Sequence, residues 1–118
     1  MNNCQKRMFE LQQIITQVSP EEAFEMQNQG AKIIDVRTIE EYQHSHIKDC
    51  IYLGRDHLEF KIEEIVLDKN SPIVIACGSG YRSLFASESI IKLGFKNVYS
   101  LDTGFKGWVR NNLPIETN

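Results

Sequence analysis

A cysteine followed by a short glycine-rich loop and an arginine is the most chemically informative feature of this sequence. Cys77 comes directly after the apolar run 73–76, and Gly78-Ser79-Gly80-Tyr81-Arg82-Ser83 follows it. A junction of strand, loop and helix can direct several backbone N–H groups and the positive end of a helix dipole toward one point. Together with the charge of Arg82, these features favour the thiolate form of Cys77, which is the nucleophilic form. The pattern predicts anionic sulfur chemistry at Cys77.

The number of residues between Cys77 and Arg82 indicates which of two kinds of anion the loop would bind. Four residues lie between them, whereas the loop of cysteine phosphatases is one residue longer. A tighter ring of N–H groups suits one extra sulfur atom better than a phosphoryl group. A phosphatase or arsenate reductase-like enzyme on the same architecture is therefore the less favoured alternative. The loop also lacks the Gly-Lys-Ser/Thr ending of a nucleotide-binding P-loop.

Strands and helices are expected to alternate around this loop. The runs 33–36 and 73–76 are apolar on both faces, and shorter strands are predicted over 14–18, 51–53 and 98–101. Helices are predicted over 19–30, 39–44, 58–66, 81–93 and 104–111, the first of them because Ser19-Pro20 starts a helix and Gly30 ends one. This alternation predicts a parallel sheet covered by helices on both faces. Ligands bind at the carboxyl ends of strands in such sheets, which is where Cys77 falls.

Length and composition indicate one domain in a reducing compartment. The chain has 118 residues, of which 42% are hydrophobic and 25% charged, enough for a single core. Residues 1–13 are interpreted as an N-terminal extension with helical spacing, and residues 14–118 as the domain. A net charge of −3 gives no electrostatic case for nucleic acid or an anionic membrane. Apolar runs are too short to span a bilayer and no signal core follows the N-terminus, so we expect a cytoplasmic protein.

Four segments make this sequence similar to the single-domain form of the rhodanese (sulfurtransferase) family. They are Ile34-Asp35-Val36-Arg37 with Glu40-Glu41-Tyr42, His46-Ile47, the loop 77–83, and Gly104-Phe105-Lys106-Gly107-Trp108 with Leu113-Pro114. The resemblance spans about residues 19–116. It implies an α/β fold with a five-stranded, mainly parallel sheet flanked by helices. It also implies a covalent persulfide on the cysteine, and we expect no other cofactor.

The resemblance assigns a role to each matching residue. Cys77 is the sulfur carrier, and the cradle for the substrate and the persulfide is formed by Gly78, Ser79, Gly80, Tyr81, Arg82 and Ser83. Arg82 is expected to hold an anionic donor. Asp35 and Arg37 are expected to brace the loop rather than to react, and Trp108 to form a wall of the pocket.

The sequence departs from the family pattern at two places. Ser45 and Lys48-Asp49-Cys50 flank His46-Ile47 where the family has Gly and Pro-Gly-Ala, which makes this turn atypical. Thr103-Gly104 replaces a pair of glycines. We expect neither departure to touch the cradle. The donor stays open, with thiosulfate favoured because Arg82 offers a fixed charge to its sulfonate end.

The function expected from these residues is sulfur transfer. A sulfane sulfur would move from a small donor such as thiosulfate to a thiophilic acceptor through a Cys77 persulfide. The acceptor would be a thiol, cyanide or a protein. The alternative is a relay module that takes sulfur from one protein and passes it to another, with little free-standing turnover.

Five further residues are given weaker interpretations. Cys50 is interpreted as a small core residue, and a resolving role for Cys4 is left open. His44 and His46 lack a third ligand at useful spacing, so no metal site is predicted. Phe85 falls on the polar side of its predicted helix, where we expect it to be exposed, either as an isolated aromatic or as a contact for a partner.

Overall fold

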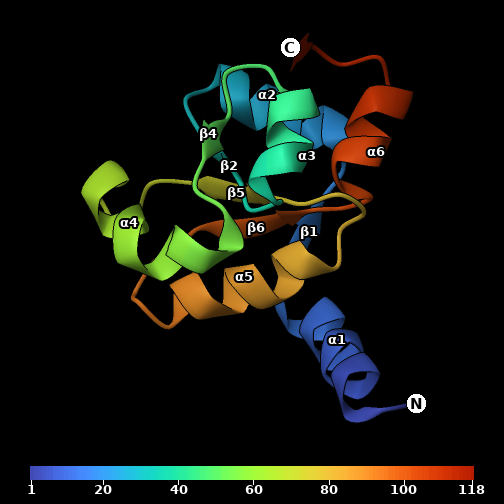
Figure 1. Ribbon diagram of the computed structural model, residues 1–118. Helices are drawn as coiled ribbons and strands as arrows, with labels where there is room; N and C mark the ends of the chain where they lie inside the picture. Colours follow the sequence, from blue (N-terminus) through green and yellow to red (C-terminus); the bar gives the residue numbers. More distant parts are fainter.

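A parallel sheet with helices on both faces forms the centre of the molecule (Figure 1). The computed structural model describes all 118 residues. Five strands lie side by side, all parallel, in the order β1 (Thr16–Val18), β6 (Val98–Leu101), β5 (Ile73–Ala76), β2 (Lys32–Asp35) and β4 (Ile51–Tyr52). The predicted five-stranded, mainly parallel sheet is confirmed, with the strand that ends just before Cys77 in the middle position.

Six α-helices surround the sheet. They are α1 (Asn3–Ile14), α2 (Pro20–Asn28), α3 (Ile39–His44), α4 (Leu58–Ile65), α5 (Arg82–Ile91) and α6 (Gly104–Arg110), with a 3-10 turn η1 (Arg55–His57) before α4. Figure 1 shows α4 and α5 below the sheet, and α2, α3 and α6 above it. None of these helices combines the length and the apolar character needed to cross a membrane.

Alternation along the strands divides the core into two layers. Ile73 and Ile75 of β5 pack with residues of α4 and α5 in one cluster. Val74 and Ala76 point to the opposite face, where they pack with residues of α2 and α6 in a second cluster. All four side chains are at most 2% exposed. The doubly apolar run 73–76 thus becomes a strand covered on both faces, as a parallel sheet requires.

Most element boundaries follow the local signals in the sequence. Ser19 caps α2, with its side chain accepting from Glu22 N–H while the Glu22 carboxylate accepts from Ser19 N–H. The predicted helix 39–44 is α3 without any shift. The predicted helix 81–93 is shorter, because α5 begins at Arg82 and ends at Ile91.

A second small sheet is absent from the expectations drawn from sequence. Strand β3 (Ser45–Ile47) pairs antiparallel with β7 (Ile115–Thr117) near the C-terminus. Each strand is only three residues long, and the two segments are far apart in the sequence. Neither segment carries a local strand signal of its own, so the pairing depends on the tertiary fold.

The N-terminal segment is a helix that covers part of α5. Leu11 of α1 is fully buried and forms a cluster with Ile15 and Leu84. Phe85 packs against this cluster and is half-buried, so the expectation that it is exposed is wrong. The sequence could not show this, because the polar-looking side of α5 is covered by a segment distant in the chain. The division into extension and domain stays a prediction.

Thr103 holds a backbone conformation that is costly for its residue type. It lies between β6 and α6 with a φ of 61°, in the left-handed region that β-branched residues avoid. Its hydroxyl donates to Asp102 O at 2.5 Å. The next residue, Gly104, has a φ of 59°. The turn that starts α6 therefore needs two successive left-handed residues, and only one of them is glycine.

We expect Thr103→Gly to raise the free energy of unfolding by about 0.5–1 kcal/mol, since relief of left-handed strain exceeds the added entropy of the unfolded glycine. Urea denaturation measures the change. The control is Asn112→Gly, at another left-handed position (φ 57°), where little gain is expected because asparagine tolerates this region. A less stable Thr103→Gly variant would show that the hydroxyl contact outweighs the strain.

Candidate active site

Cys77 lies directly after β5, at the carboxyl edge of the sheet. Its side chain is 1% exposed. The sulfur accepts hydrogen bonds from the backbone N–H groups of Gly80 at 3.1 Å and Ser83 at 3.3 Å, and it lies 3.4 Å from Ser83 Oγ. The loop after β5 therefore folds back over the sulfur and directs hydrogen-bond donors at it, an arrangement that stabilises negative charge on sulfur.

The members of the predicted cradle differ in their contacts. Gly80 has a φ of +98°, and a Cβ there would come within 3.0 Å of Thr103 N, so the bend over the sulfur requires glycine. Ser79 and Tyr81 are exposed and make no side-chain hydrogen bond to the sulfur. Gly78 is half-buried beneath the guanidinium of Arg82, which would lie 2.8 Å from a Cβ at that position.

The start of α6 holds the cradle from behind. Phe105 N–H donates to Cys77 O at 2.7 Å, and Lys106 N–H donates to Gly78 O at 3.1 Å. A Cβ on Gly104 would come within 2.5 Å of Cys77 O and 2.6 Å of Gly78 C. The first turn of α6 can approach the loop this closely only with glycine at position 104. The expectation that Thr103-Gly104 does not touch the cradle is therefore wrong, because this pair packs directly against the loop.

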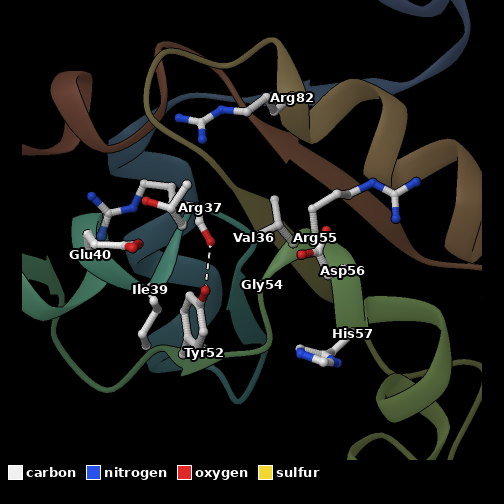
Figure 2. A pocket seen from close by; sticks show the side chains of 11 residues that line it. Val36, Arg37, Ile39, Glu40, Tyr52, Gly54, Arg55, Asp56, His57 and Arg82 are labelled. Atoms are coloured by element: carbon white, nitrogen blue, oxygen red, sulfur yellow. Dashed lines mark hydrogen bonds between the residues drawn. The ribbon is translucent and has the colours of Figure 1, made fainter.

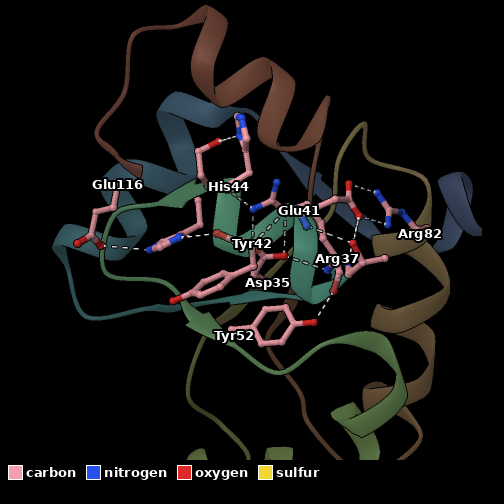
Figure 3. Close-up of polar contacts among 11 residues, drawn as sticks. Asp35, Arg37, Glu41, Tyr42, His44, Tyr52, Arg82 and Glu116 are labelled. Carbon is pink, nitrogen blue, oxygen red and sulfur yellow. Dashed lines mark hydrogen bonds and ion pairs between the residues drawn. The ribbon is translucent and has the colours of Figure 1, made fainter. Parts of the chain in front are cut away.

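Asp35 and Arg37 form a buried ion pair at the end of β2. Both are at most 5% exposed, and the Arg37 guanidinium donates to both carboxylate oxygens of Asp35 and to Ser45 O (Figure 3). The guanidinium carbon also lies 4.4 Å from the centre of the Phe105 ring. Because Phe105 N–H holds Cys77 O, the pair supports the cradle through Phe105. This geometry fits the bracing role expected for Asp35 and Arg37.

Arg82 is paired with Glu41 and makes no hydrogen bond to the sulfur. Its two terminal nitrogens donate to the two carboxylate oxygens at 2.9 and 3.1 Å (Figure 3). These hydrogen bonds lower the pKa of Glu41 to about 2 against the opposing effect of burial. Thr38 N–H and Oγ1 donate to the same carboxylate, as part of the cap of α3. Glu41 is thus fixed in place and carries a charge at neutral pH.

A cavity of about 660 Å³ lies beside this ion pair, at the carboxyl ends of β2 and β4. It is lined by Val36, Arg37, Thr38, Ile39, Glu40, Tyr52, Gly54, Arg55, Asp56, His57 and Arg82. Arg82 extends over it from the start of α5 (Figure 2), whereas Arg55 binds Glu59 and Ser89 on the other side. Arg82 is the one cradle residue that lines this cavity.

The model of the Rhodanese-like domain family matches residues 19–111, well over half of the chain. The chain belongs to the rhodanese-like domain family. It is 33% identical over 108 residues to thiosulfate sulfurtransferase GlpE of Actinobacillus pleuropneumoniae, covering 91% of this chain and 98% of the relative. The GlpE protein of Haemophilus influenzae is 36% identical over 102 residues, or 86% and 94% of the two chains.

A solved structure of another rhodanese-like chain supports the same fold. Thiosulfate sulfurtransferase from Pseudomonas aeruginosa superposes with a TM-score of 0.82 at 23% identity, covering 92% of this chain and 21% of that chain. At this identity the likeness shows the fold alone. The resemblance drawn from the four sequence segments is therefore confirmed for family and fold.

Trp108 has the contacts of a core residue. It is fully buried, its Nε1–H donates to Pro114 O at 2.8 Å, and its ring meets the edge of Phe24. It does not line the cavity beside Arg82. The structure therefore places it in the anchoring of α6, rather than in the pocket wall where the sequence led us to expect it.

The remaining thiols and the histidine pair make no hydrogen bond to the sulfur of Cys77. Cys50 is half-buried, and burial is the main cause that raises its pKa to about 12, so its thiol is protonated at neutral pH. Cys4 is exposed on α1. His46 stacks on Tyr42 and hydrogen-bonds Tyr42 O through Nδ1. No group of three or more metal-ligating side chains is gathered anywhere in the structure.

Glu41 occupies both terminal nitrogens of the Arg82 guanidinium, so we expect it to compete with other anions for this group. Glu41→Gln should bind sulfate about threefold to fivefold more tightly, because a partly exposed ion pair of this kind is worth up to about 1 kcal/mol. Glutamine at this position retains the helix cap. Titration calorimetry of the two proteins with sulfate measures the difference.

The matched control is Glu22→Gln, which removes the same charge from an equivalent cap at the start of α2, where Glu22 is hydrogen-bonded to Ser19 and not to Arg82. Its sulfate affinity should equal that of the unmodified protein. Equal or weaker affinity of Glu41→Gln would show that Glu41 orients Arg82 for anion binding instead of competing with the anion.

Proposed function

We propose that this rhodanese-like chain transfers a sulfane sulfur from an anionic donor to a thiophilic acceptor through a persulfide on Cys77. One observation carries the proposal: the Cys77 sulfur lies at a strand end and accepts two backbone N–H hydrogen bonds from its own loop. The named sulfurtransferase relatives, which match over most of this chain, support the same activity. Thiosulfate is the donor that we propose.

In the first half-reaction, the thiolate of Cys77 attacks the outer sulfur of thiosulfate. A bond forms between the two sulfur atoms, the sulfur–sulfur bond of thiosulfate breaks, and its electron pair leaves with sulfite. No proton moves in this step, so no general base is needed once the thiolate is present. In the second half-reaction an acceptor thiolate or cyanide attacks the terminal sulfur and Cys77 leaves as thiolate. Ping-pong kinetics are expected.

The cradle favours this chemistry by holding charge on buried sulfur. The N–H groups of Gly80 and Ser83 are fixed before any substrate binds, because α6 and the Asp35–Arg37 pair already support the loop. Donors that are fixed in advance need no reorganisation when charge moves to the sulfur. The 1% exposure of Cys77 limits access of water to the persulfide.

A relay between proteins is the second candidate, favoured by the surface around the cradle. Tyr81 in the loop is 51% exposed, and Ile39 at the cavity is 43% exposed. Aromatic and apolar groups at such a site suit a protein acceptor. Stoichiometric formation of the persulfide with very slow turnover on cyanide and small thiols would favour the relay over the free-standing enzyme.

Cys77→Ser should abolish sulfur transfer while the fold is retained, since serine has no sulfur to carry. After incubation with thiosulfate, intact-protein mass spectrometry should show the mass of one added sulfur atom on the unmodified protein and none on the variant. Cys50→Ser is the control and should still gain the sulfur, because the Cys50 thiol is protonated at neutral pH. Sulfur transfer by Cys77→Ser near the normal rate would overturn the assignment.

Insertion of one glycine between Ser79 and Gly80 tests the size of the cradle. The longer loop should move the N–H group of Gly80 away from the sulfur and reduce sulfur transfer by about tenfold or more, as expected for loss of a charge-stabilising donor. Hydrolysis of a generic phosphate ester is measured beside it. Unchanged sulfur transfer in the insertion variant would show that loop length does not select the anion. Phosphatase activity of the unmodified protein that is lost in Cys77→Ser would favour the phosphatase alternative.

A further inference from the structure

Two buried hydroxyl groups extend from the sulfur of Cys77 into the sheet. Ser83, in the first turn of α5, has its Oγ 3.4 Å from the sulfur and 2.7 Å from Oγ of Ser100 on β6. Both serines are 0% exposed. Ser100 Oγ has no other hydrogen-bond partner in the structure. A buried hydroxyl group is destabilising unless it is hydrogen-bonded. The direction of each hydrogen bond in the series Cys77–Ser83–Ser100 therefore affects the free energy of the site.

The number of hydrogens differs between the two states of the sulfur. When Cys77 is a thiol, its S–H donates to Ser83 Oγ and the Ser83 hydroxyl donates to Ser100. The hydrogen of Ser100 then has no acceptor. When Cys77 is a thiolate, Ser100 donates to Ser83 and Ser83 donates to the sulfur. Every hydroxyl hydrogen is then used, and the sulfur accepts three hydrogen bonds, the other two coming from Gly80 and Ser83 N–H.

We propose that Ser100 is a positioning residue that keeps the Ser83 hydroxyl directed at the charged sulfur of Cys77. Ionisation releases the thiol proton to solvent, and the two hydroxyl hydrogens only rotate, so no proton passes along the chain. The role of Ser100 in sulfur transfer rests on the proposed function, because the same charged sulfur is the attacking group. Its effect on the free thiolate does not depend on any donor.

The charged groups around the loop are held by contacts that do not involve the Ser100 side chain. Arg82 lies over the neighbouring Gly78 and is paired with Glu41. The Asp35–Arg37 pair reaches the loop through Phe105. None of these groups contacts Ser100 through a hydrogen bond. A comparison of serine variants therefore isolates the contribution of the hydroxyl chain.

The experiment measures alkylation of Cys77 by iodoacetamide at neutral pH without any sulfur donor, followed on the Cys77 peptide by mass spectrometry. Because only the thiolate reacts, Ser100→Ala should slow alkylation about threefold to tenfold, as expected for loss of one buried hydrogen bond to a charged group. Circular dichroism confirms that each variant is folded. A folded Ser100→Ala variant that reacts at the normal rate would overturn the proposal.

Ser87→Ala is the matched control. Ser87 is also 0% exposed on α5, and its hydroxyl donates to the backbone carbonyl of Ser83 at 2.7 Å without joining the chain to the sulfur. Its alkylation rate should equal that of the unmodified protein. Equal slowing in Ser87→Ala and Ser100→Ala would mean that Ser100 acts through packing alone, which contradicts the proposal.

A double-variant cycle tests whether Ser100 acts through Ser83. Once Ser83→Ala has removed the link, a further change of Ser100 to Ala should slow alkylation no more, because interacting residues are not additive. Independent, multiplicative slowing would overturn the proposal. If Ser100→Ala does not fold, Ser100→Thr replaces it, because threonine keeps the hydroxyl group. This variant should be alkylated at the normal rate. Slow alkylation of folded Ser100→Thr would count against the proposal. If the alkylation rates follow these expectations but the unmodified protein transfers no sulfur, the proposed function is overturned and the role of Ser100 is retained.

Discussion

The close approach of α6 to the loop after β5 is the constraint on which the rest of the site depends. The first turn of α6 binds the carbonyl groups of Cys77 and Gly78, and this contact is possible because Gly104 has no side chain. With the carbonyls turned toward α6, the N–H groups of the loop turn toward the sulfur. The peptide groups that follow Cys77 and Gly78 thus bind α6, while those that end at Gly80 and Ser83 face the sulfur.

Two arginine–carboxylate pairs near the loop differ in burial and therefore in their consequences. The Asp35–Arg37 pair is buried, and loss of one partner from such a pair typically costs about 3–5 kcal/mol. In the Arg82–Glu41 pair the side chains are 47% and 37% exposed, so that pair is weak and can be exchanged for another anion. The buried pair belongs to the scaffold, whereas the exposed pair places the guanidinium of Arg82 at the edge of the cavity.

The sequence was sufficient for the parallel sheet and for the position of Cys77, because each depends on local patterns. Apolar strands, the cap at Ser19 and the glycine loop all act within a few residues of one another. It was insufficient wherever two distant segments meet. Glu41 as the partner of Arg82, Ser100 as the partner of Ser83, and the pairing of β3 with β7 have no signal within either segment alone.

The packing of α1 on α5 has a consequence for how this protein behaves when it is shortened. Leu11 and Ile15 cover Leu84, which follows Ser83 in the helix that begins at the cradle. Without residues 1–15, Leu84 and Phe85 would face solvent as a contiguous apolar surface, and such surfaces drive self-association. The N-terminal helix thus covers an apolar surface next to the point where the loop around Cys77 ends.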